Sequence, residues 1–120
     1  MDGEITTDDL ATLLDDGEEV RIVDIRSPAA FRRGHIPGSE NVPFPELTTR
    51  AEELSDADRI VTVCPHGESS IQAARLLQSY EGTSDARIES LAGGLNDWDG
   101  DLEAGEETAT AANEGPDAPF

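Results

Sequence analysis

Cys64 is the only cysteine of the chain, and it stands where a β-branched apolar run (59–64) ends. Six mostly small or polar residues follow before a helical pattern begins. A thiol becomes a good nucleophile when its thiolate is stabilised. A tight loop on Gly67 can turn backbone N–H groups inward as an anion-binding nest, and the dipole of the next helix adds positive potential. These residues therefore favour nucleophilic chemistry at Cys64, with a thiolate, a persulfide or an oxyanion leaving group in the nest.

A lone cysteine at the end of an apolar strand can also be a small buried hydrophobic residue. The residues after it favour the reactive interpretation. A cysteine that only packs needs no Pro-His-Gly segment and no two serines, Ser69 and Ser70, at the start of a helix.

Strands and helices are predicted to alternate along the chain. The residue patterns predict strands at 4–5, 20–25, 59–64 and 87–91, and a brief strand or extended piece at 41–43. They predict helices near 7–14, 28–34, 47–54 and 70–80, and a last turn or helix from Gly93. This alternation predicts an α/β domain with a parallel sheet, and the alternative is an irregular α+β domain. Ligands of such sheets bind at the carboxyl ends of strands, where we expect both Asp24 and Cys64.

Composition excludes several classes of function. With 120 residues, the chain fits one domain. Its 27 acidic residues against 8 arginines give a net charge of −19, which disfavours binding to nucleic acid or to an anionic membrane. One cysteine excludes an internal disulfide and a cysteine-rich zinc site, and two histidines do not replace it. Since no apolar run reaches the length of a membrane span and no secretory leader is visible, we expect a cytoplasmic protein.

The excess of acidic residues has two interpretations. One is a solvated surface that aids solubility. The other, which we favour because the acids are spread along the whole chain, is an organism that keeps molar salt in its cytoplasm, where charge repulsion is screened. The net charge also disfavours self-association, so we expect a monomer.

Several short motifs occur in a specific order over residues 4–99. They are D-I-R-S-P at 24–28 with Phe31, G-H-I-P-G at 34–38, N-V-P at 41–43, V-T-V-C at 61–64 with Gly67, and L-A-G-G-L at 91–95 with Trp98. In this order they resemble the rhodanese-like family of sulfurtransferases. The resemblance gives a domain at 1–99, and the acidic segment 100–120 is predicted to be a disordered tail.

The resemblance implies a three-layer rhodanese-like fold, with a small, mostly parallel sheet and helices on both faces. It implies a sulfurtransferase that moves sulfane sulfur through a Cys64 persulfide to a thiol, cyanide or protein acceptor, without a metal or cofactor. The implied partners are a small sulfane-sulfur donor or a sulfur-carrier protein. The residues implied to line the nest are His66, Gly67, Glu68, Ser69 and Ser70. Three further residues are expected to support it: Asp24 and Arg26 as a structural ion pair or cap, and His35 through backbone hydrogen bonds.

The loop departs from the family pattern where an anionic donor would bind. The family commonly carries Arg five residues after the cysteine, whereas this chain has Ser69, preceded by the carboxylate of Glu68. We therefore expect weak activity with thiosulfate, partly compensated if His66 is protonated. Because Ser70 stands at the sixth position, where related phosphatases carry their Arg, hydrolysis of phosphate esters is disfavoured.

Two other functions stay open. One is a catalytically weak or silent rhodanese-like module that binds a partner or regulates it, which the missing Arg and Glu68 favour. The other is a redox-sensing thiol. The presence of both Cys64 and Gly67 favours the sulfurtransferase.

Overall fold

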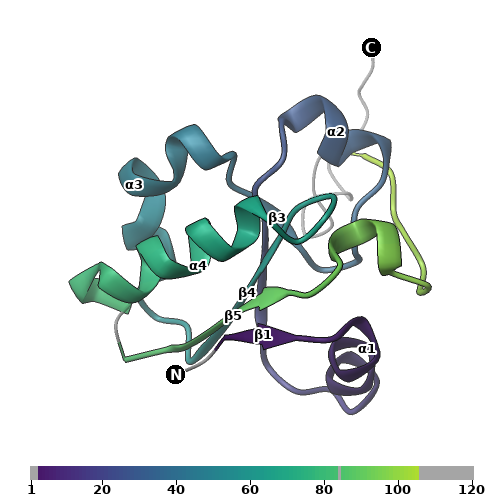
Figure 1. Cartoon of the computed structure of the whole chain (residues 1–120), viewed down its shortest axis with the longest axis horizontal. Helices are drawn as coiled ribbons and strands as arrows, with labels where there is room; N and C mark the ends of the chain where they lie inside the picture. The colour runs from purple at the N-terminus through teal and green to yellow at the C-terminus, as the bar shows by residue number, and fades with distance from the viewer. Residues whose placement is uncertain (1–2, 84, 106–120) are drawn as a thin grey trace.

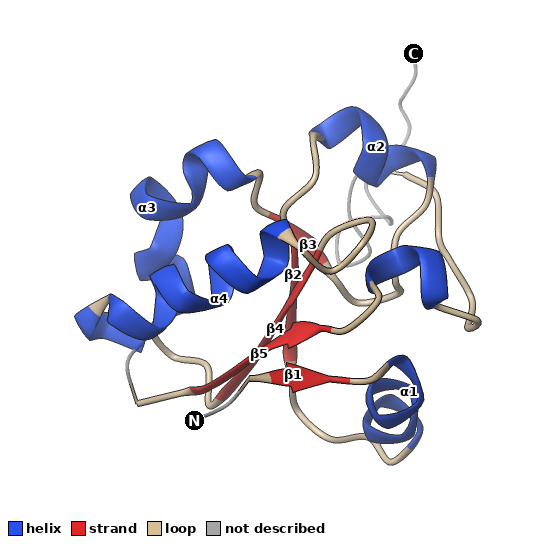
Figure 2. Cartoon of the chain, in the orientation of Figure 1, coloured by secondary structure: helices blue, strands red, loops and turns tan. Residues whose placement is uncertain are grey.

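The computed structural model of the chain describes residues 3–83 and 85–105. Its centre is one sheet in the order β1-β5-β4-β2-β3, in which all paired neighbours are parallel. The strands are β1 (Glu4–Ile5), β2 (Arg21–Asp24), β3 (Glu40–Asn41), β4 (Arg59–Val63) and β5 (Arg87–Leu91). Figures 1 and 2 show this sheet between helices on its two sides. The predicted α/β class is confirmed, and the α+β alternative is wrong.

The middle strand, β4, is buried along nearly its whole length, as its apolar and β-branched sequence predicts. It pairs with β2 so that Val63 lies opposite Asp24, and the Ile25 N–H donates to the Val63 carbonyl at 3.0 Å. The residue after Val63 is Cys64. Asp24 and Cys64 therefore lie at the same carboxyl edge of the sheet, as expected.

The α-helices are α1 (Thr7–Asp15), α2 (Pro28–Arg33), α3 (Leu47–Arg50) and α4 (Ser69–Ser79). Two of them, α1 and α2, begin at a side-chain cap. Thr6 Oγ1 accepts a hydrogen bond from the Asp9 N–H at 3.1 Å, and Ser27 Oγ accepts one from the Ala30 N–H at 3.2 Å, with Pro28 at the first helical position.

The sheet separates two apolar cores. One lies between the sheet and α3 and α4, and the other lies between the sheet and α1 together with the 3₁₀ turn η4 (Gly94–Asp97). Along β4 the side chains alternate between them: Ile60 and Cys64 face the α4 side, and Val61 and Val63 face the α1 side. Helices on both faces make this the three-layer arrangement that was predicted.

The segment predicted as one helix over 47–54 has two parts. α3 ends at Arg50 and is followed by the 3₁₀ turn η2 (Ala51–Leu54); two further 3₁₀ turns are η1 (Phe44–Glu46) and η3 (Glu81–Thr83). A 3₁₀ turn has three residues per turn, so residues three apart share one face. Ala51 and Leu54 both face the core, where each is fully buried.

Residues just beyond the predicted domain end remain attached to it. Glu103 pairs with His35 through two backbone hydrogen bonds of 2.9 and 2.7 Å, and the Gly105 N–H donates to the Arg32 carbonyl. Most of the predicted disordered tail, at 106–120, lies outside the described residues. Among the described helices, none has both the length and the apolar composition that a membrane span requires.

Candidate active site

The Cys64 sulfur lies at the carboxyl end of β4 and faces the start of α4. The Gly67 N–H donates to it at 3.1 Å and the Ser70 N–H at 3.4 Å, and the Ser70 hydroxyl oxygen lies 3.4 Å away. Cys64 is only 2% exposed. The sulfur is therefore shielded from solvent, and one amide inside the loop and one in the first turn of α4 point at it.

This environment makes the thiol more acidic than a free cysteine. Burial by itself raises the pKa of the Cys64 thiol, because a thiolate loses hydration there. The Ser70 hydroxyl, the Ser70 N–H, and the N–H groups of Gly67 and His66 act in the opposite direction and together bring the pKa below its ordinary value. The nest thus stabilises the thiolate against the cost of burying it.

Only a glycine fits at position 67. Its φ of +85° is a left-handed conformation, and a Cβ there would lie 2.8 Å from the Gly93 N and 3.1 Å from the Leu91 carbonyl oxygen. The loop after Cys64 therefore packs directly on the backbone that follows β5.

In the segment after β5, the Gly93–Gly94 pair also allows this contact, because neither residue has a side chain. Gly94 has a φ of +66°, and a Cβ on it would lie 2.5 Å from the Pro65 carbonyl oxygen. Next to it, the Leu95 N–H donates to the Cys64 carbonyl at 2.9 Å, and the Asn96 N–H donates to the Pro65 carbonyl at 3.0 Å. Two motifs far apart in sequence thus support one loop.

His66 is held by a residue that the sequence did not point to. The Asn96 side-chain amide lies 2.7 Å from His66 Nδ1. Because the amide nitrogen Nδ2 only donates, Nδ1 accepts and the ring proton lies on Nε2. The contact depends on two loops meeting in space, and the spacing of the residues gives no signal of it.

The other two loop residues predicted for the site are Glu68 and Ser69. Glu68 is the N-cap residue of α4 and Ser69 is its first residue; both are exposed. Over residues 3–83 and 85–105, neither forms a hydrogen bond with Cys64. They can contact a bound donor, but they do not stabilise the thiol.

Asp24, Arg26 and His35 hold the neighbouring segment. Arg26 binds the 1% exposed Asp24 through Nε at 2.9 Å and Nη2 at 2.7 Å, and the same Nη2 donates to the Gly34 carbonyl at 2.7 Å. His35 Nδ1 donates to the Phe31 carbonyl at 2.8 Å, and the two rings stack 3.8 Å apart. These bonds tie the end of β2 to α2 and its following turn, so the three residues position structure at the edge where Cys64 lies.

Two further buried residues near the thiol went unnoticed in the sequence, Thr62 on β4 and Ser90 on β5. Ser90 Oγ lies 2.6 Å from Ser70 Oγ, and Thr62 Oγ1 donates to the Ser70 carbonyl at 2.7 Å. The sequence feature that could have revealed them is the alternation of side chains between the two faces of a strand. Thr62 and Ser90 are polar residues on the face that otherwise carries Ile60 and Ile88.

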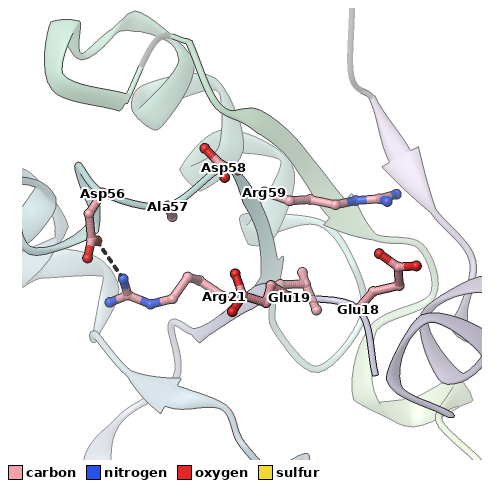
Figure 3. Close-up of a pocket in the computed structure, with 8 residues that line it drawn as sticks. Glu18, Glu19, Arg21, Asp56, Ala57, Asp58 and Arg59 are labelled. Atoms are coloured by element: carbon pink, nitrogen blue, oxygen red, sulfur yellow. Dashed lines mark hydrogen bonds and ion pairs between the residues drawn. The ribbon is translucent and has the colours of Figure 1, made fainter. Parts of the chain in front are cut away.

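A cavity of about 380 Å³ lies at the opposite, amino end of β2 and β4. Figure 3 shows Arg21 beside Asp56 in it, a contact of 2.9 Å. Arg21 also binds Glu40, and Arg59 binds the buried Glu89 at 2.9 Å. Carboxylates therefore already pair both arginines of this cavity.

Comparisons with known proteins agree with the fold. Residues 6–101 match the family "Rhodanese-like domain". A protein named sulfurtransferase from Allochromatium vinosum is 35% identical over 82% of this chain and 89% of its own length. The putative sulfur carrier protein YrkF of Bacillus subtilis is 31% identical over 83% of the chain, which spans only 52% of that relative. The solution structure of the rhodanese-like domain of an Anabaena protein superposes with a TM-score of 0.75 at 26% identity, covering 100% of this chain and 91% of that one.

Proposed function

Because this chain belongs to the rhodanese-like domain family, we propose that it is a sulfurtransferase that carries sulfane sulfur as a persulfide on Cys64. The observation that carries this proposal is the set of polar groups around its one thiol: the Gly67 and Ser70 N–H groups, which donate to the sulfur, and the Ser70 hydroxyl oxygen 3.4 Å away. Relatives named sulfurtransferase and sulfur carrier support the same chemistry.

The reaction has two displacement steps. In the first, the Cys64 thiolate attacks the outer sulfur of the donor; a bond forms between Sγ and that sulfur, and the old sulfur bond leaves its electron pair on the departing group, sulfite in the case of thiosulfate. In the second, a thiolate, cyanide or protein acceptor attacks the outer sulfur, and Cys64 leaves as a thiolate. Each step returns an anion to the nest, where the amides stabilise it.

The loop favours donors of low charge or a sulfur-carrier protein. Glu68 and Ser69 are exposed residues of the loop, so a thiosulfate dianion that approaches it meets a carboxylate and no guanidinium. A relative from Pseudoalteromonas translucida, 38% identical over 70% of this chain, is named thiosulfate sulfurtransferase GlpE. We therefore propose that thiosulfate is turned over here, with a high KM as the consequence of the loop's charge.

Intact mass measurement tests the proposal. The pure protein is incubated in molar KCl with thiosulfate, a polysulfide or glutathione persulfide, and then treated with cyanide. The expected result is a gain of one sulfur atom that cyanide removes as thiocyanate, and that the Cys64→Ser variant does not show. If none of the donors adds sulfur to the folded wild type, the proposal is wrong.

A silent binding module is the second candidate, and the 2% exposure of Cys64 favours it. Such a module would bind a partner equally well in the wild type and in Cys64→Ser, without any sulfur adduct. The same mass experiment therefore decides between the two.

A further inference from the structure

A small polar cluster interrupts the apolar core beneath the start of α4. Thr62, Ser70 and Ser90 are exposed by no more than 1%. Thr62 and Ser90 lie on the face of the sheet that otherwise carries Ile60 and Ile88 and that packs against α4. Buried hydroxyls destabilise a core unless they are hydrogen bonded. Here all three are hydrogen bonded, and Ser70 joins the group to the Cys64 sulfur.

Hydrogen bonds link the members of this cluster to one another and to the Cys64 thiol. Thr62 Oγ1 donates to the Ser70 carbonyl at 2.7 Å and so fixes the first turn of α4 against β4. The Ser70 hydroxyl lies between two partners, with Ser90 Oγ at 2.6 Å and Cys64 Sγ at 3.4 Å. Ser70 therefore connects the sulfur with a second hydroxyl deeper in the core.

The number of protons decides which group donates in each of these hydrogen bonds. Each serine hydroxyl has one proton to donate. A neutral Cys64 thiol can donate to Ser70, but a thiolate only accepts, so Ser70 must then donate its proton to the sulfur. The contact between the two hydroxyls then requires Ser90 to be the donor.

We propose that Ser90 is a positioning residue of the active site, whose hydroxyl donates to Ser70 and thereby directs the Ser70 hydroxyl to the Cys64 thiolate. A hydrogen bond received by Ser70 polarises its own O–H and strengthens the bond that it donates. In the described part of the chain no hydrogen bond joins Ser90 to the sulfur, so Ser90 acts through Ser70. The inference rests on the proposed function in one respect, that the thiolate is the form that attacks the donor.

Other ionisable groups lie on the elements around the thiol. They include His66 and Glu68 in the loop, Asp24 at the end of β2 with its partner Arg26, Arg75 on α4 and Asp97 after β5. The variants proposed below change none of them, so their contribution is common to every protein compared.

The test is a titration of the thiolate by its ultraviolet absorbance, read as a difference from Cys64→Ser. With one cysteine in the chain, the signal belongs to Cys64 alone. Ser70→Ala should raise the pKa of Cys64 by about one unit, because a charge-assisted hydrogen bond is lost. Ser90→Ala should raise it by about half a unit, since the Ser70 bond is only weakened. Ser39→Ala is the matched control: Ser39 is buried like Ser90, its hydroxyl donates to the Ile36 carbonyl at 2.6 Å, and its loss should leave the pKa of Cys64 unchanged.

A double variant separates positioning from a general effect on the fold. If Ser90 acts through Ser70, Ser90→Ala should add no shift in the Ser70→Ala background. An equal shift in both backgrounds, no shift in either, or a lowered pKa in Ser90→Ala alone overturns the proposal. Should Ser90→Ala not fold, Ser90→Thr keeps the hydroxyl and must keep the wild-type pKa; a raised pKa there refutes the proposal too. Because this titration needs no sulfur donor, its outcome is independent of whether the protein transfers sulfur.

Discussion

Gly67→Ala is the substitution whose effect the geometry defines best. The alanine must adopt the left-handed conformation of Gly67, which costs about 1–2 kcal/mol. Its Cβ would also lie 2.8 Å from the Gly93 N, closer than a real Cβ contact, so one of the two loops must move. Such overpacking costs about 1–3 kcal/mol more. We therefore expect the free energy of unfolding to fall by about 2–5 kcal/mol.

The same movement changes the thiol. The Gly67 N–H donates to the Cys64 sulfur at 3.1 Å, and a displaced loop withdraws this donor. A lost hydrogen bond to a charged acceptor corresponds to about one unit of pKa, so the pKa of Cys64 should rise by about that amount. Sulfur transfer at neutral pH should slow accordingly, because less of the thiol is ionised.

Gly17→Ala is the matched control. Gly17 has a similar φ of +74°, but a Cβ there meets no atom within 4 Å. This variant therefore carries the conformational cost without the collision, and its thiol should titrate as in the wild type. Chemical denaturation and thiolate absorbance measure both quantities in both variants. If Gly67→Ala is no less stable than Gly17→Ala and its Cys64 pKa is unchanged, the account of the loop is refuted.

Three more predictions concern the donor, pH and salt. Ser69→Arg should increase kcat/KM for thiosulfate about tenfold through a charge-assisted contact, and a steady-state assay that shows no increase would undercut the explanation of the high KM. The pKa of the Cys64 thiol is lowered from its ordinary value, so ionisation stabilises the fold. The stability of the wild type relative to Cys64→Ala should therefore be greatest above the pKa of an unfolded cysteine, about 8.5, and should decline as pH falls through the folded-state pKa. A stability difference that grows toward low pH contradicts this sign. Because the net charge is −19, the melting temperature should rise from dilute buffer to molar KCl; a constant melting temperature in calorimetry speaks against adaptation to high salt.

Local signals made most of the fold predictable. Ser27 before Pro28 marked the start of α2, and the buried strand β4 was visible in its β-branched run, because caps and strands depend on neighbouring residues. The switch from α3 to a 3₁₀ turn at Ala51 was not visible, because the residue pattern over 47–54 fits one continuous helix.

The site was predictable in part for the same reason. Gly67, Ser70 and Cys64 lie close together in sequence, so the loop that they form could be anticipated. The contacts between Asn96 and His66 and between Ser90 and Ser70 join residues 30 and 20 positions apart, and they exist only because β5 lies beside β4. No local pattern carries that information.

The measurement that tests the central claim most directly is the pKa of Cys64 in the unmodified protein, from the pH dependence of thiolate absorbance with Cys64→Ser as the baseline. The account predicts a value below that of a free cysteine, about 8.5, because the inward-pointing amides and the Ser70 hydroxyl outweigh burial. A value at or above about 8.5 would contradict it, since burial would then dominate and more of the thiol would be neutral where sulfur transfer requires an anion.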